Sequence, residues 1–187
     1  KTEQMFGDIQ KTEQSPTSTK IPLNDAQKNA LKALQKAPQG TKLLKGVTGS
    51  GKTNIYLKMA KNALKQQKSV ILLVPEIALT SQLVRVFQQY FSQNILLIHS
   101  KQTEAERHLI FNRLLESDSP KIVIGPRSAL FAPLHNLGLI IIDEEHDSSY
   151  SSESAPRYNT FDVALLRAKR NGCKLVLGSA TPAVETY

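Results

Sequence analysis

Five short apolar runs recur along the chain, and in none of them do apolar and polar residues alternate. The runs are Val70–Val74, Ile95–Ile98, Ile122–Ile124, Leu139–Ile142 and Leu175–Leu177. Continuous apolar runs of this length are typical of strands buried on both faces of a parallel sheet. Helical patterns separate the runs, around residues 79–91, 103–116 and 160–170. The alternation predicts an α/β fold with a mostly parallel, doubly wound central sheet, helices on both faces and right-handed crossovers.

A glycine-rich segment with the sequence GVTGSGKT, residues 46–53, lies between the apolar pair Leu43–Leu44 and an amphipathic helical pattern. This is the pattern and the context of a phosphate-binding loop, whose backbone N–H groups and following helix attract a polyphosphate. Lys52 is expected to reach the β- and γ-phosphates, and Thr53 to offer its hydroxyl to Mg²⁺. The remaining contacts are predicted from Gly46, Thr48, Gly49, Ser50 and Gly51. A glycine-rich turn that fits the pattern by chance is the alternative.

Two helices flank this loop. The one that follows carries an apolar stripe, which core packing explains without any functional role: Tyr56, Met59, Ala60, Ala63 and Leu64. The one that precedes the loop is predicted to be capped by Asn24 or Asp25 and to end at Pro38. Near its start, Gln27 is a candidate adenine reader, because an amide donates and accepts hydrogen bonds at once. An ordinary glutamine on the helix surface is the alternative.

Two acids, Asp143 and Glu144, follow directly after the apolar run that ends at Ile142. The carboxyl ends of parallel strands meet at one edge of a sheet, so these acids are expected to face the phosphate loop. We expect Asp143 to hold Mg²⁺, directly or through water, and Glu144 to orient and deprotonate an attacking water. An acidic helix start is the alternative. His146 either couples the nucleotide to the strand before residues 178–181 or is an ordinary hydrogen-bonded histidine.

Composition limits the remaining possibilities. The formal net charge is +8, and the excess lies after residue 20, which favours a nucleic-acid partner or lysines on solvated helix faces. Residues 1–20 are predicted to be a flexible linker or cut end, with residues 21–187 as one domain. The single Cys173 excludes a disulfide framework within this chain and suggests a reducing compartment. With no apolar run of membrane-spanning length and no signal-peptide pattern, we expect a cytoplasmic protein without membrane contact.

Further motifs carry a resemblance to a known family. The phosphate loop, VPEIALTSQ, IGPRSALF, DEEH and GSATP occur in the order seen in superfamily-two helicases. From about Leu23 to the end, the chain more closely resembles the bacterial primosomal replication-restart helicases. The segments that carry this resemblance are LLIHS, GPRSALF, NLGLIIIDEEHDSSY and PRYNTFDVALLRA. The DEEHDSSY…PRY block makes it specific, because most helicases of the superfamily lack that block.

The resemblance implies a RecA-like P-loop NTPase fold, the first of two motor lobes that close on ATP and Mg²⁺. In this family the motor moves 3′ to 5′ on single-stranded DNA and reloads the replication machinery at stalled forks. The implied partners are single-stranded and forked DNA, replication-restart (primosome) proteins and single-strand-binding protein, for a protein expected to be a monomer. The second lobe, with its zinc sites and arginine finger, is expected outside this chain, so no zinc is expected here. The lobe alone should hydrolyse ATP very slowly.

The resemblance implies the same roles for the residues already singled out and adds further site residues. Gln27 falls in the adenine-reading motif, Lys52 and Glu144 in the catalytic positions, and Thr53 and Asp143 in the metal positions. Ser179 and Thr181 match the motif that links hydrolysis to DNA movement, and His146 is the third candidate for coupling. Residues in segments that lie along DNA in relatives are Pro75, Glu76, Thr80, Gln82, Gly125, Arg127 and Ser128. In the aromatic-rich loop from Ser148 to Tyr158, thought to sense single strands, Tyr150, Arg157 and Tyr158 are the candidates for DNA contact.

Three alternatives stay open. Both tyrosines of the loop can instead pack under it, without contact to DNA. The motor can belong to another branch of the superfamily, such as a restriction or repair translocase. The chain can also be a nucleotide-dependent binding switch with no motor activity.

Overall fold

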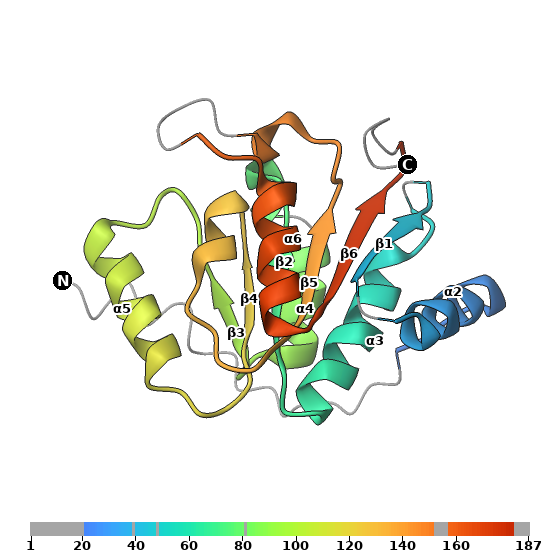
Figure 1. Ribbon diagram of the computed structural model, residues 1–187, viewed down its shortest axis with the longest axis horizontal. Coiled ribbons are helices and arrows are strands. Elements are labelled where there is room, and N and C mark those ends of the chain that lie inside the picture. Colours follow the sequence, from blue (N-terminus) through green and yellow to red (C-terminus); the bar gives the residue numbers. More distant parts are fainter. Residues whose placement is uncertain (1–20, 39, 48, 81, 152–156, 182–187) are drawn as a thin grey trace.

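The computed structural model describes residues 21–38, 40–47, 49–80, 82–151 and 157–181 (Figure 1). Its sheet has six strands in the order β1-β6-β5-β2-β4-β3, and every neighbouring pair is parallel. The strands are β1 (Gly40–Lys45), β2 (Ser69–Leu73), β3 (Ile95–Leu97), β4 (Ile122–Gly125), β5 (Leu137–Asp143) and β6 (Lys174–Ser179). The predicted α/β fold with a parallel sheet is confirmed. The predictions for residues 1–20, for Thr48 and for residues 152–156 lie outside the described residues.

The α-helices are α2 (Asp25–Lys36), α3 (Lys52–Lys65), α4 (Gln82–Phe91), α5 (Glu104–Leu115) and α6 (Thr160–Asn171). Three short 3₁₀ turns are η1 (Glu76–Thr80), η2 (Arg127–Phe131) and η3 (Ser148–Tyr150). The helix expected around residues 79–91 begins only at Gln82. The preceding residues form η1, which opens with a 2.8 Å bond from the Ala78 N–H to the Pro75 carbonyl.

The sheet separates two hydrophobic clusters. Val70 and Leu72 of β2 belong to the cluster under α2, α3 and α4, whereas Ile71 and Leu73 belong to the one under α6 and η2. Every residue of β2 is buried, as expected for a strand covered on both faces. Figure 1 shows α6 in front of the sheet, with the arrowheads of β5 and β6 pointing to the top of the view. Burial of each large apolar side chain is worth about 1.5–3 kcal/mol.

The helix ends carry local capping groups, and the predicted cap at the start of α2 is confirmed. Asn24, rather than Asp25, caps α2, and its capping box is completed by Gln27. Thr103 and Glu106 form the capping box of α5. Gly172 ends α6 with a left-handed φ of 59°, a conformation that glycine adopts without a Cβ penalty. No helix within the described residues is long and apolar enough to cross a membrane.

Candidate functional site

The phosphate loop connects the end of β1 to the start of α3. Its first residue is docked on β6 by a 3.0 Å bond from the Gly46 N–H to the Ser179 carbonyl. Gly49 and Gly51 both have a φ of 80°, the left-handed region that a residue with a Cβ rarely adopts. Gly51 is also the N-cap of α3, so the positive end of that helix opens into the loop. The local geometry is therefore that of an anion-binding loop.

Lys52 lies between this loop and the end of β5. Its side chain is only 9% exposed, and Nζ donates to the Gly46 carbonyl at 2.7 Å. The carboxylate of Glu144 lies on its other side, with Oε1 3.5 Å from Nζ. The catalytic acid predicted from the strand end and the lysine predicted from the loop therefore meet. They come from segments that are 92 residues apart in the chain (144 − 52).

Asp143 is the last residue of β5, and its carboxylate is tied to α3. The Tyr56 hydroxyl donates to Asp143 Oδ1 at 2.9 Å, and Tyr56 lies one turn after Lys52 on that helix. Burial raises the pKa of Asp143 above its usual range, and the negative charge of Glu144 adds to this effect. The bond from Tyr56 and the positive charge of Lys52 act in the opposite direction. A cation beside Asp143 would favour its charged form.

Glu144 has a left-handed backbone, with a φ of 48°. For a residue with a long side chain this conformation costs about 1–2 kcal/mol, so the surroundings must hold it. Two bonds do so: the Asp147 N–H donates to the Glu144 carbonyl at 2.8 Å, and the Glu145 N–H donates to the Gly178 carbonyl at 3.1 Å. The chain leaves β5 in this turn and no α-helix starts there, so the acidic helix start is wrong.

His146 contacts the end of β6. Its Nδ1 lies 2.8 Å from Oγ of Ser179, which is fully buried and which also accepts a 3.1 Å bond from the Thr181 N–H. A second contact places His146 Nδ1 3.8 Å from Glu144 Oε2. The three predicted coupling residues therefore form one connected group beside Glu144. Their role in coupling stays a prediction.

Gln27 is not on the helix surface, so that alternative is wrong. It is 9% exposed and lies against the phosphate loop, with Nε2 donating to the Ser50 carbonyl at 2.9 Å. Its Oε1 accepts a 2.9 Å bond from the Asn24 N–H as part of the capping box. A Cβ on Gly51 would lie 2.2 Å from Nε2, so a side chain at position 51 would displace the Gln27 amide from this place. Nε2 keeps a second hydrogen and Oε1 a second lone pair, so the amide can still donate to and accept from a base; the role of Gln27 as an adenine reader stays a prediction.

Two residues predicted to contact DNA instead form hydrogen bonds to main-chain carbonyls of this chain. Arg127 donates from Nη1 to the Ser149 carbonyl at 3.0 Å and to the Ser151 carbonyl at 2.6 Å, and so holds η3 in place. Tyr150 is 6% exposed, and its hydroxyl donates to the main-chain carbonyl of Asp143 at 2.7 Å. Its buried ring is therefore not available to stack on a base in this arrangement. The alternative that Tyr150 packs under the loop fits the structure.

Tyr158 is half-buried and has an aromatic partner that sequence reasoning missed. Its ring meets that of Phe131 edge to face, with centroids 5.3 Å apart and an interplanar angle of 84°. Phe131 ends η2 and is 51% exposed. Only the fold shows that Phe131 lies beside Tyr158, because the two residues are 27 positions apart in the chain (158 − 131).

The other residues predicted to lie along DNA differ in accessibility. Pro75 and Gly125 are buried, and a Cβ on Gly125 would lie 2.7 Å from the Ile98 carbonyl oxygen, so close packing explains that glycine. Ser128 is half-buried, whereas Gln82 and Arg157 are exposed. The structure does not describe the side chain of Thr80.

The acids of the site fit magnesium only together with phosphate. Among the described residues, no group of three or more histidines, cysteines, aspartates and glutamates could hold a metal ion by itself. Mg²⁺ typically takes one or two carboxylates and completes its shell with water and substrate phosphates. Asp143, beside the start of α3 where Thr53 lies, is compatible with that mode of binding.

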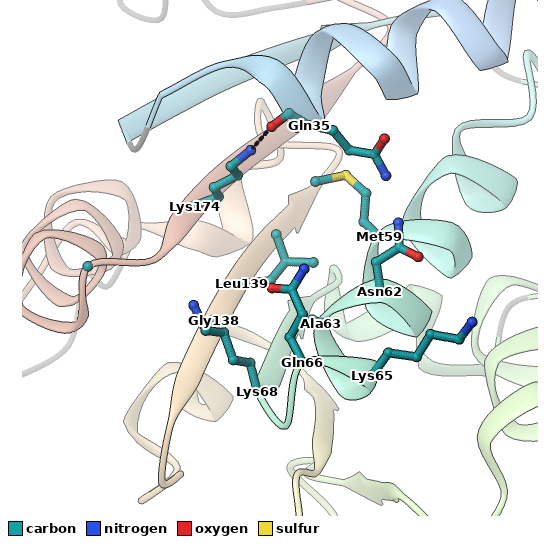
Figure 2. A pocket seen from close by; sticks show the side chains of 11 residues that line it. Gln35, Met59, Asn62, Ala63, Lys65, Gln66, Lys68, Gly138, Leu139 and Lys174 are labelled. Carbon is teal, nitrogen blue, oxygen red and sulfur yellow. Dashed lines mark hydrogen bonds between the residues drawn. The ribbon is translucent and has the colours of Figure 1, made fainter.

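A separate cavity of about 420 Å³ lies at the opposite, amino edge of the sheet (Figure 2). Its lining includes Lys65, Lys68 and Lys174 and no acid. Lys174 Nζ donates to the Leu34 and Gln35 carbonyls at the end of α2, both at 2.7 Å. Burial, with Lys42 nearby, lowers the pKa of Lys174. Since the carboxyl ends of helices carry negative partial charge, the end of α2 explains the position of Lys174.

Comparisons with known proteins agree with this site. The family model described as DEAD/DEAH box helicase matches residues 24–187. Replication restart protein PriA of Chlamydia pneumoniae is 52% identical over 148 residues, which cover 79% of this chain and 20% of that protein. PriA of Bacillus subtilis is 40% identical over 189 aligned positions, which cover 99% of this chain and 23% of that protein. The resemblance to replication-restart helicases is confirmed, and the chain spans about a fifth to a quarter of these relatives' length.

Solved structures agree on the fold. The structure of T4 UvsW aligns with a TM-score of 0.61 at 17% identity, over 97% of this chain and 34% of that one. The helicase MrfA aligns with a TM-score of 0.58 at 21% identity, over 87% of this chain and 27% of that one. Together with the family match over residues 24–187, this establishes that the chain belongs to the DEAD/DEAH box helicase family.

Proposed function

We propose that the chain is the ATP-binding lobe of a DNA helicase that moves 3′ to 5′ on single-stranded DNA and restarts replication at stalled forks. The observation that carries the proposal is the meeting of Lys52 from the phosphate loop with Glu144 from the end of β5, 3.5 Å apart. In P-loop NTPases the γ-phosphate binds next to the loop lysine and the strand-end acid, so a contact between these two residues marks its expected position. The PriA relatives support the replication-restart context.

The chain's own residues would act by positioning and by charge. Lys52 would exchange the Gly46 carbonyl for phosphate oxygens, because a hydrogen bond between two charged groups is stronger than one to a neutral carbonyl. That exchange also frees Glu144 to accept a hydrogen bond from the attacking water. Asp143 and Thr53 would hold magnesium, which supplies positive charge against the β- and γ-phosphate oxygens when bound.

The rest of the longer protein is expected to supply groups at the γ-phosphate. An arginine finger contributed from elsewhere is worth about 10³–10⁵ in rate, so turnover by this chain alone should be very slow. DNA would be held through its backbone without regard to sequence, by exposed residues such as Gln82 and Arg157 and by the ring of Tyr158. Primosome proteins, single-strand-binding protein and a cytoplasmic location belong to the same proposal.

Titration of a fluorescent, non-hydrolysable ATP analogue into the purified chain tests the proposal. We expect saturable binding that strengthens with Mg²⁺ and is lost in Lys52→Ala. Lys65→Ala is the matched control, because it removes a lysine from the other end of the same helix. Equal binding by the Lys52→Ala variant and the wild type would refute the nucleotide site.

In the full-length protein, two measurements separate the alternatives. If the protein is a motor, the Glu144→Gln variant should bind ATP but fail to hydrolyse it and to move along DNA. If the protein is a pure binding switch, the same variant should keep its full function. The polarity of strand displacement separates a replication-restart helicase from a motor with another task.

A further inference from the structure

Tyr56 does more than fill the core, which is the only role that its place on the apolar stripe of α3 suggests. Its side chain is completely buried in the cluster between α3 and the sheet. A buried hydroxyl needs a partner, and this one donates to Asp143 Oδ1 at 2.9 Å. Burial, followed by the nearby charge of Asp143, raises the pKa of Tyr56 far above its usual range.

Gly178 makes room for this hydroxyl. It is the residue of β6 that pairs with Asp143 in the sheet. A Cβ built on Gly178 would lie 1.6 Å from Oη of Tyr56, 2.9 Å from its Cζ and 3.2 Å from Asp143 Oδ1. A side chain at this position is thus incompatible with the bond between Tyr56 and Asp143. Position 178 must therefore be a glycine to leave room for the Tyr56 hydroxyl.

Asp143 is held from both faces of the sheet. Tyr56 belongs to the hydrophobic cluster on one face and fixes the carboxylate, while Tyr150 belongs to the cluster on the other face and fixes the main-chain carbonyl. The bond from Tyr56 engages Oδ1, and the main-chain N–H of Glu144 also bonds to this carboxylate. Each carboxylate oxygen has more than one lone pair, so these bonds set the rotation of the group and still leave lone pairs for a cation or its water. Groups that orient a metal ligand in this way typically change metal affinity or activity by about 10–100-fold.

We propose that Tyr56 is a positioning residue, whose hydroxyl orients the Asp143 carboxylate toward magnesium in the space that Gly178 leaves open. The inference rests on the proposed nucleotide site. It predicts that loss of the hydroxyl weakens the magnesium dependence of nucleotide binding and leaves the phosphate loop itself intact.

The test measures binding of the fluorescent ATP analogue to the full 187-residue chain as Mg²⁺ is varied. In Tyr56→Phe, the Mg²⁺ concentration at half-maximal effect should rise about 10-fold or more, while affinity without Mg²⁺ stays within about twofold of wild type. Tyr90→Phe is the matched control, because it removes the same atom from a tyrosine at the far end of another helix, α4. A purely structural role would instead lower the unfolding temperature and leave the Mg²⁺ midpoint unchanged, which would overturn the inference.

A double-mutant cycle with Gly178→Ala distinguishes loss of the Tyr56 hydroxyl from a general packing defect in Tyr56→Phe. Gly178→Ala alone should reproduce the magnesium defect, because its Cβ displaces the hydroxyl. Combined with Tyr56→Phe it should add little to the magnesium defect, because the 1.6 Å clash with Oη is gone and the remaining contact, 2.9 Å from Cζ, needs only a small shift of the ring. Additive defects would overturn the inference. Failure of the wild-type chain to bind the nucleotide with Mg²⁺ would refute the proposed function, and this inference with it.

Discussion

Replacement of Arg127 distinguishes a structural residue from a DNA-binding one. In the structure its guanidinium donates to the carbonyls of Ser149 and Ser151, and so links η2 to η3. Hydrogen bonds from a charged group are worth about 1.5–3 kcal/mol each. Because the guanidinium is partly exposed and water replaces it at the carbonyls, we expect Arg127→Ala to cost about 1–3 kcal/mol in total.

Thermal unfolding of the 187-residue chain is the assay. For a chain of about 150–250 residues, 1 kcal/mol corresponds to about 2–4 °C, so the midpoint should fall by about 2–12 °C. Arg113→Ala, at an exposed position in the last turn of α5, is the control and should change the midpoint by less than about 2 °C.

Arg127→Lys sharpens the distinction between the two roles. The lysine keeps the positive charge but has no planar fork to span two carbonyls, so it should recover less than half of the lost stability. A phosphate contact, by contrast, would survive the change to lysine. If Arg127→Ala left the unfolding midpoint unchanged but weakened DNA binding, with the salt slope reduced by about 1, the structural role would be refuted.

Two further predictions concern titrating groups. Burial raises the pKa of Cys173 to about 11, so its thiol should resist alkylation at pH 8 in the folded chain and react once the chain is unfolded in urea. The unfolded thiol ionises near 9.0, so the stabilisation that the protonated, buried thiol provides is complete below that pH and is lost as the pH rises toward 11. Rapid labelling of the native chain at pH 8 would contradict the predicted protection of the thiol. Burial also raises the pKa of Asp143, so its charged form opposes folding at neutral pH. Asp143→Asn should therefore raise the unfolding midpoint of the ligand-free chain while abolishing magnesium-dependent nucleotide binding, and a lowered midpoint measured by calorimetry would contradict the first part.

Local signals in the sequence determined most of the architecture. Apolar runs without alternation predicted the strands, because a strand buried on both faces has no polar side to reveal. The capping boxes and the glycine stop depend on residues three or four positions apart, so they could be read from short segments. The phosphate loop could be read in the same way, because its glycines and its lysine lie within eight consecutive residues, 46–53.

Only the tertiary structure decided which polar groups meet. Tyr56 and Asp143 are 87 residues apart, and nothing in the apolar stripe of α3 indicates that one of its hydroxyls reaches a strand end. Arg127 lies 22 residues before Ser149, and its type is equally suited to a phosphate or to a backbone carbonyl. The physical reason is that a side chain's partner depends on what the fold brings within about 3 Å, and sequence spacing carries little information about that.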